Sequence, residues 1–590
     1  MSAVVERGSI RGGRAMARFV GSAAWRLIAW GMFLSCAWFV VTFLYVPNIG
    51  VLREVIFPSS GDPLATAVEL FSSARVLAAI RDTLIVTAVS LVTVSAVGIT
   101  QAFILEAFCI RGKGFLTVAY AIPLVFGSVA AVTGYVMVYG AGGPITIGLQ
   151  RLLPGLPDDW FSGIPAVILV HTFTMTGYHF LFLRPAIRRI DFSMVEAARS
   201  LGMSPVPAFV RVVLPVLRPM IVASLLMVLI GSLGSFAAPN ILGGGSFTMV
   251  GPLIRTLTSL GRPDMAALLG VLLALATVGL LAWALRAERR ASLFSAAKST
   301  RPFQPTRVGN PIGRATLYAV AYALALVNML PVLVTVLMAF SPVEAIRNGQ
   351  LWGGLTLDNF ATVFGDSGAV APLVNSLLLC VIAIPVALTI GTALSHFVDR
   401  HRGAATDALQ MTFFLPYFLP GVLIALGFLI VFGAPHVLTG GHVLVGSFWI
   451  LPLAYVVILL PTVVRFVRAA VAGVDPALDE AARALGARSP RRFALITLPM
   501  LVPVLVQVAA LSFNATFDEY TVSVMLYNVN NRPLGVAMGA LAATPDPELV
   551  GVATAYVVLN TVIALGVVLF ADRMAAWQSR RVVGAMGGAR

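Results

Sequence analysis

The feature that most constrains this chain is a series of apolar segments, each about 20 residues long, separated by short polar stretches. A helix of that length crosses the hydrocarbon core of a bilayer. The segments lie near 27–46, 82–106, 115–139, 163–184, 216–240, 264–285, 315–340, 372–397, 408–433, 445–467, 500–525 and 549–571. Charged residues make up 11% of the chain, against about a quarter of a soluble domain. The predicted fold is therefore an all-α integral membrane protein with about twelve transmembrane helices.

Basic residues lie mainly on one side of the expected bilayer. With the N-terminus in the cytoplasm, 32 of the 40 Lys and Arg residues fall in cytoplasmic segments and eight fall outside. Because cytoplasmic loops of membrane proteins are rich in Lys and Arg, both termini are expected in the cytoplasm of a multi-pass protein of the cell (inner) membrane. The net charge of +15 is thus explained by topology, and a nucleic-acid partner is not expected.

The polar segments divide the chain into five parts. Residues 1–26 are predicted to form a basic cytoplasmic tail, 27–285 a first six-helix half and 315–571 a second. The stretch 286–314 between the halves is polar, basic and contains prolines, which is typical of a linker. Residues 572–590 are predicted to form a cytoplasmic C-terminal tail.

A segment of the first half recurs in the second at a constant offset of 284 residues. The motif residues are Glu196, Ala197, Ala198, Gly202 and Pro215 in the first copy, and Glu480, Ala481, Ala482, Gly486 and Pro499 in the second. Both copies fall in the cytoplasmic loop between the fourth and fifth spans of their half. The halves therefore have the same orientation and form a parallel duplication.

The repeated loop has the residues of a short, exposed helix. Glu-Ala-Ala-Arg favours helix, Asp191 and Asp475 are suitable N-caps, and Gly202 and Gly486 are suitable terminators. One interpretation is a helix that only caps the bundle. Two copies at matched positions favour a second interpretation, in which each helix docks into a groove of a partner.

On these motifs the chain resembles the permeases of type I, binding-protein-dependent ABC importers. Their signature is Glu-Ala-Ala, three residues, Gly and a later hydrophobic-Pro pair, and both copies match it. The resemblance implies that Glu196–Met203 and Glu480–Ala487 are coupling helices that insert into two ABC ATPase subunits, and that a periplasmic solute-binding protein delivers the solute. The fusion of both halves resembles the ferric iron and thiamine branches.

The ATPase itself is not expected in this chain. A phosphate-binding Walker A loop needs a glycine frame before its Lys, and neither Lys113 nor Lys298 has one. ATP and Mg are therefore assigned to the partner, and no cofactor, catalytic residue or metal site is expected here. His436 and His442 share one loop and could touch a metal, but a pair of loop histidines more often has no such role.

A candidate solute path, or outer gate, follows from acidic residues in the eleventh expected span. Charged groups at membrane depth are costly, yet Asp518 and Glu519 lie there. The same offset maps them to Gly234 and Ser235, where nearby prolines and glycines indicate an interrupted helix. The candidate residues are Ser235, Phe236, Pro239, Asn240, Asn514, Asp518 and Glu519. The alternative is that the two acids lie at the water interface and only orient the helix.

The solute stays open. The two acids would favour a cation such as a polyamine or metal ion, while the stretch from Pro239 to Gly245 resembles the polyamine and 2-aminoethylphosphonate branches. The alternative function is an ion-gradient-driven secondary transporter, which would also have twelve spans. It should carry carboxylates near mid-bilayer in several helices and lack a duplicated docking helix.

Overall fold

The computed structural model describes Gly31 and residues 34–587, apart from 292–303, most of 401–418, and positions 246, 349, 351–352, 488, 543 and 545. The expected tail 1–26 and part of the linker lie outside the described residues. Within the described part every regular element is a helix, and β structure is limited to one isolated parallel bridge between Phe108 and Thr306.

The first half contains both long and short helices. They are η1 (Val41–Tyr45), α2 (Val46–Ile56), α3 (Pro63–Ser72), α4 (Ala74–Ala107), α5 (Lys113–Val125), α6 (Ser128–Tyr139), α7 (Pro144–Leu152), α8 (Gly163–Thr174), α9 (Thr176–Arg188), α10 (Phe192–Ser200), α11 (Pro205–Ala208), η2 (Phe209–Val213), α12 (Leu214–Val216), α13 (Arg218–Leu233), α14 (Ala237–Leu242), α15 (Val250–Ser259) and α16 (Pro263–Ala291).

The second half repeats this order. Its helices are α17 (Pro311–Ala339), α18 (Val343–Arg347), α19 (Asp358–Gly365), α20 (Ser367–Arg400), α23 (Gly421–Phe432), η4 (Val437–Thr439), α24 (Ile450–Ala472), α25 (Pro476–Ala484), α26 (Ser489–Arg492), η5 (Phe493–Thr497), α27 (Leu498–Thr516), α28 (Ser523–Leu526), η6 (Val529–Asn531), α29 (Leu534–Ala542) and α30 (Pro547–Gly587).

The helices account for the expected spans. Ten described helices are long and apolar enough to cross a membrane, and the pair Val206–Val216 and Arg218–Leu233, bent by 76°, gives an eleventh. The shorter apolar helix α23 lies where the ninth span is expected, and part of that span is outside the described residues. The all-α fold with about twelve spans in two repeats is confirmed.

Several boundaries differ from expectation, and each difference has a local cause. The first span continues past 46 to Ile56 because Pro47 sits at the start of α2, where proline is tolerated. The third span breaks at Phe126 and Gly127. The eleventh ends at Thr516 instead of 525. α30 continues as helix to Gly587, through most of the expected C-terminal tail.

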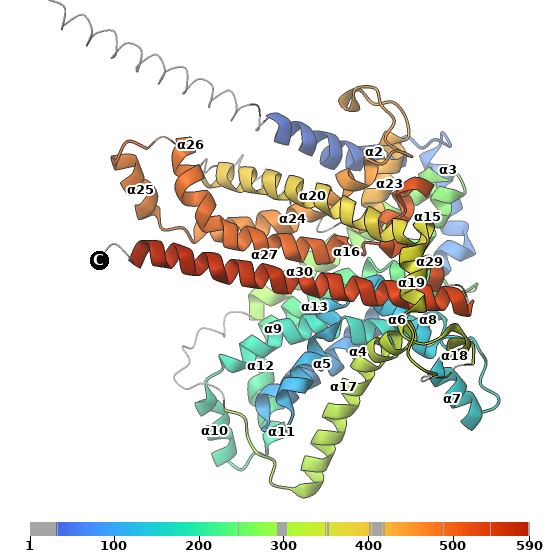
Figure 1. Ribbon diagram of the computed structural model, residues 1–590, viewed down its shortest axis with the longest axis vertical. Helices are drawn as coiled ribbons and strands as arrows, with labels where there is room; N and C mark the ends of the chain where they lie inside the picture. Colours follow the sequence, from blue (N-terminus) through green and yellow to red (C-terminus); the bar gives the residue numbers. More distant parts are fainter. Residues whose placement is uncertain are drawn as a thin grey trace, which may run out of the picture.

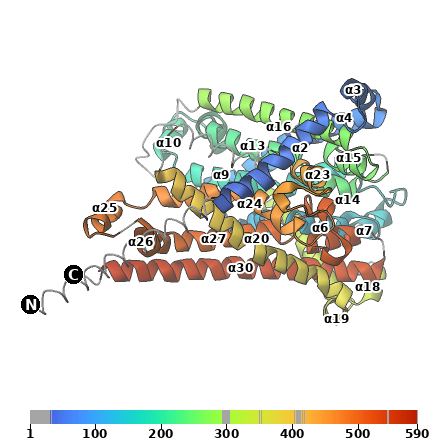
Figure 2. The same cartoon turned by 90° about the horizontal axis from the view of Figure 1, so that it is seen from above.

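Helices of each half pack against helices of the other half. α2 of the first half packs on α23 of the second, and α17 of the second half packs on α5 and α6 of the first. The helices α10 and α25 lie at one end of the molecule with the end of α30, while α3, α7 and α18 lie at the other (Figures 1 and 2). The equivalent helices α10 and α25 therefore lie on the same side, as a parallel duplication requires.

Candidate functional site

The two expected coupling helices, α10 and α25, begin with the same cap. The Asp191 carboxylate accepts a hydrogen bond from the Ser193 amide at 3.0 Å, and the Asp475 carboxylate accepts one from the Ala477 amide at 2.9 Å. Each bond satisfies a backbone N–H that has no partner inside its helix. The predicted N-caps are confirmed.

The two helices also end alike. Gly202 and Gly486 adopt positive φ angles of 87° and 77°, a conformation that costs a residue with a Cβ about 1–2 kcal/mol. The chain then folds back, so that the Met203 amide bonds to the Ala198 carbonyl at 3.1 Å and the Ala487 amide bonds to the Ala482 carbonyl at 2.9 Å. This is the Schellman arrangement, and it explains the glycine of each motif.

Each helix presents a leucine that the sequence analysis did not select. Leu201 is 82% exposed and Leu485 is 88% exposed, and the 284-residue offset relates them. Glu196 and Glu480 are exposed on the same short helices. Leu201 and Leu485 are therefore equivalent exposed apolar side chains, one in each half. The constant offset was the signal that could have identified these leucines.

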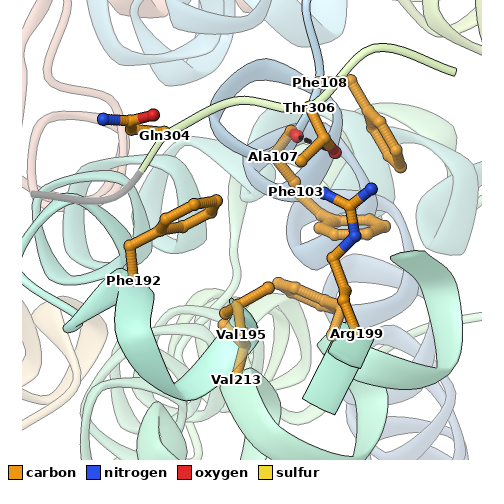
Figure 3. A pocket seen from close by; sticks show the side chains of 10 residues that line it. Phe103, Ala107, Phe108, Phe192, Val195, Arg199, Val213, Gln304 and Thr306 are labelled. Carbon is orange, nitrogen blue, oxygen red and sulfur yellow. Dashed lines mark hydrogen bonds between the residues drawn. The ribbon is translucent and has the colours of Figure 1, made fainter. Parts of the chain in front are cut away.

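The helices differ in how they attach to their own half. Phe192 and Val195 of α10 are buried against Phe209 and Val213, and Figure 3 shows them around a small cavity of about 20 Å³ that Thr306 of the linker also lines. α25 is held differently, because its Asp479 pairs with Arg492 of α26 at 2.8 Å. Asp479 also pairs with Arg483 within α25 at 3.2 Å.

The proline of each motif follows a single π-helical turn. Pro215 lies in the first turn of α12 after η2, and Pro499 lies in the first turn of α27 after η5. The π turn leads without a break into the helix that carries the proline, so each proline lies inside a helical run, where its missing N–H removes one backbone hydrogen bond. The same π turn in both halves extends the repeat beyond the docking helices.

The structure brings the breaks of spans five and eleven together. The offset maps Phe236 onto Tyr520, and these two rings are in contact, with centroids 5.8 Å apart. The Asn240 amide donates a hydrogen bond to the Tyr520 hydroxyl at 2.7 Å. Equivalent residues of two repeats can meet in this way where a pseudo-twofold axis passes between them. Tyr520 was not selected from the sequence.

Asp518 is buried at this meeting point. It is 4% exposed, so it does not lie at a water interface in this conformation. Its carboxylate lies directly against Gly127, at the N-terminal end of α6, and a Cβ added to Gly127 would overlap it. Oδ2 has no hydrogen-bond partner. The carboxylate of the second half therefore fits the break in the third span of the first half, close to the positive end of a helix dipole.

Glu519 caps a helix of its own half. One carboxylate oxygen accepts from the Val522 amide at 2.8 Å, and the other accepts from the Ser523 amide at 2.9 Å and from the Ser523 hydroxyl at 2.7 Å. That hydroxyl also lies 2.7 Å from the Tyr455 hydroxyl. Glu519 thus orders the start of α28.

A cavity of about 340 Å³ lies beside this junction. Ser235 and Phe236 line it, and Thr521 brings the second half to its wall. Its other polar lining groups are Ser128, His171, Thr174 and Tyr178. Asp518 and Glu519 are not among its lining residues. Pro239 is buried in α14 and Asn514 is half-buried on α27, and neither lines the cavity.

His171 is a residue of this cavity that the sequence analysis left among the scattered histidines. Its Nε2 lies 2.9 Å from the Ser235 hydroxyl, and its Nδ1 lies 3.3 Å from the Ser90 hydroxyl and 3.4 Å from that of Ser232. A lone His in an apolar segment carries no signal of such contacts, because its partners come from α4 and α13.

The loop histidines have a local role. The His436 ring nitrogen Nδ1 accepts a hydrogen bond from the Leu438 amide at 3.2 Å and caps η4. Across the described residues, no group of three or more His, Cys, Asp or Glu side chains could hold a metal ion.

Comparison with known proteins decides the family. Residues 112–290 and 383–584 match the model of the binding-protein-dependent transport system inner membrane component. The chain belongs to this family. Its two matches lie in the two halves, so this permease contains the family domain twice.

Three relatives show how far the similarity reaches. The "Probable ABC transporter permease protein y4fN" of Sinorhizobium fredii is 43% identical over 93% of this chain and 97% of its own length. The "Ferric transport system permease protein FbpB" of Actinobacillus pleuropneumoniae is 22% identical over 92% of this permease and 77% of its own length. The "Putative 2-aminoethylphosphonate transport system permease protein PhnV" of Salmonella choleraesuis is 27% identical over 46% of this chain and 99% of its own.

Proposed function

We propose that this permease is the membrane subunit of an ATP-driven importer that moves a small solute inward after a periplasmic binding protein delivers it. The observation that carries the proposal is the pair of docking helices. They are capped by Asp, ended by Gly, and placed at the same end of the molecule (Figure 2). The family membership and the names of its relatives support the same function.

Two ABC ATPase subunits would bind at α10 and α25, with ATP and Mg held on those subunits. Leu201 and Leu485 would each enter an apolar groove of one ATPase. The solute-binding protein would dock at the opposite end, where α3, α7 and α18 lie (Figure 1). In this proposal α10, α25 and both termini would lie in the cytoplasm of a bacterium with an inner membrane.

The arrangement supports alternating access with the described state closed to the outside. Phe236 and Tyr520 are in contact between the halves, and Asp518 is seated against Gly127. Closure of the ATPases on ATP would draw α10 and α25 together and separate these contacts. Hydrolysis would return the halves to the state described here.

Substitution of the two exposed leucines tests the proposal. Burying one leucine contributes about 1.5–3 kcal/mol, so Leu485→Asp should weaken ATPase binding by on the order of tenfold or more. The ATPase is co-purified with the wild-type permease, Leu201→Asp and Leu485→Asp. The matched control is Leu260→Asp, since Leu260 is 67% exposed and follows α15 at the other end.

The expected result is loss of the ATPase from both docking-helix variants and its retention by the control. Equal recovery from all four proteins would refute the docking role. Solute uptake driven by an ion gradient, with no ATPase present, would establish the secondary transporter instead.

A further inference from the structure

A basic hollow lies beside α9, toward the end of the molecule that carries α10 (Figure 1). It measures about 400 Å³ and is lined by Leu124, Phe180, Leu181, Arg184, Pro185, Arg188 and Arg189. It lies next to the gate cavity along α9, because Tyr178 lines the cavity and Leu181 lines the hollow. The two spaces therefore follow one another from the gate toward the docking end.

One face of α9 forms the wall of this route. Tyr178, Leu181, Pro185 and Arg188 are exposed and follow each other at intervals of three or four residues, which places them in one stripe. The remaining faces of α9 pack on α4, α5 and α13. Thr521 of the second half lines the same cavity as Tyr178. The face of α9 that carries Tyr178 therefore points toward the junction of the two halves.

The charge along the route is positive. Glu106 is the carboxylate nearest the hollow and is 5% exposed. It is already paired with Arg184, with Arg188 at 3.0 Å and with Lys113 at 3.4 Å. Three cations on one carboxylate leave a net positive charge, and Arg189 adds to it.

The second half supplies matching charges. The 284-residue offset maps Leu181 to Arg465 and Arg184 to Arg468, both on the corresponding part of α24. Topology alone accounts for basic residues at the cytoplasmic ends of spans. It does not account for three arginines around one hollow that lies beside the cavity on α9. The described lining residues of both spaces include no Asp or Glu.

We propose that this hollow is an oxyanion-binding vestibule, and that the solute of this permease carries a phosphonate, phosphate or carboxylate group. The proposal rests on the proposed function, because it assumes that the cavity and the hollow are the solute path. A polycation or bare metal cation would meet arginines on leaving the gate, while an oxyanion would gain charge-assisted hydrogen bonds from them. The acids that suggested a cation line neither space, since Asp518 lies against Gly127 and Glu519 accepts hydrogen bonds from the Val522 and Ser523 amides.

The test measures binding to the purified full-length permease in phosphatidylcholine nanodiscs, with methylphosphonate and spermidine as probes. Arg189→Gln is the informative variant, because loss of Arg184 or Arg188 would leave Glu106 short of a partner. Arg211→Gln is the matched control, since Arg211 is exposed on η2 near the same end and lines neither space.

Methylphosphonate should bind more tightly than spermidine, and Arg189→Gln should weaken it by about tenfold, as loss of one hydrogen bond to a charged group does. Arg211→Gln should bind as wild type does. Tighter binding of spermidine, no binding of methylphosphonate, or equal binding by Arg189→Gln would overturn the proposal.

A parallel arm separates a solute from a lipid headgroup. Nanodiscs that contain phosphatidylglycerol are compared by native mass spectrometry. The wild-type permease could retain phosphatidylglycerol while Arg189→Gln loses it, with no methylphosphonate bound to either protein. That result would show that the arginines bind a lipid headgroup, and it would overturn the solute proposal. ATPase co-purification from the same preparations tests the proposed function separately, so the failure of one is distinguishable from the failure of the other.

Discussion

The contact between Asp518 and Gly127 makes the sharpest prediction about the gate. In the structure, a Cβ on Gly127 would fall 2.6 Å from Oδ1 of Asp518 and would overlap Oδ2. Gly127 has a φ of −57°, which alanine adopts without strain. Any cost of Gly127→Ala must therefore come from displacement of the Asp518 carboxylate. Overpacking of this kind costs about 1–3 kcal/mol.

A double-mutant cycle isolates the free-energy cost of displacing the Asp518 carboxylate. Gly127→Ala is compared in the wild-type background and in an Asp518→Ala background, where the carboxylate no longer blocks the new methyl group. The free energy of unfolding is measured by titration with a denaturing detergent. Gly127→Ala should cost about 1–3 kcal/mol in the first background and less than about 0.5 kcal/mol in the second.

A matched control is available on α5. Gly114 lies in the first turn of α5 and has no heavy atom within 4 Å of its added Cβ, so Gly114→Ala should change stability by no more than about 0.5–1 kcal/mol, in the stabilising direction. Equal costs for Gly127→Ala in both backgrounds would refute the reasoning, because the methyl group would then clash with something other than Asp518.

Three further outcomes are expected. Gly486→Ala should destabilise the end of α25 by about 1 kcal/mol because of its positive φ, and ATPase co-purification should fall with it; unchanged recovery would contradict this. Glu519→Gln should lower the free energy of unfolding by about 1–3 kcal/mol, because charge-assisted bonds to two amides and a hydroxyl are replaced by weaker ones; an unchanged titration would count against the cap. The pKa of Glu69 is held below its ordinary 4.5 by hydrogen bonds from Arg262. Its contribution to stability is therefore present above pH 4.5 and lost as the pH falls through the lower, folded-state pKa. Glu69→Gln should make stability less dependent on pH in that acidic window, and an identical profile would exclude the pair as a contributor.

The docking helices show how much local sequence can predict. Each cap and each glycine terminator depends on interactions within about one helical turn of its own position, and the structure has them as expected. The constant offset then gave the parallel duplication. The role of these helices in binding an ATPase stays a prediction.

The gate shows where local sequence was insufficient. Asp518 and Glu519 were selected because charge at membrane depth is costly, and the structure buries Asp518 within the protein. What their carboxylates face was not predictable. Each faces backbone at a helix start, Gly127 in one case and Val522 in the other, so the two acids by themselves do not indicate the charge of the solute.

The sequence by itself determined the membrane class, the two parallel halves and the paired docking helices, because hydrophobic length, charge asymmetry and caps act over short stretches of chain. Only the tertiary structure decided which groups meet at the centre. Phe236 reaches Tyr520, and His171 reaches Ser235, through the packing of helices that are distant in sequence. No local pattern encodes those distances, because they depend on how every intervening helix packs.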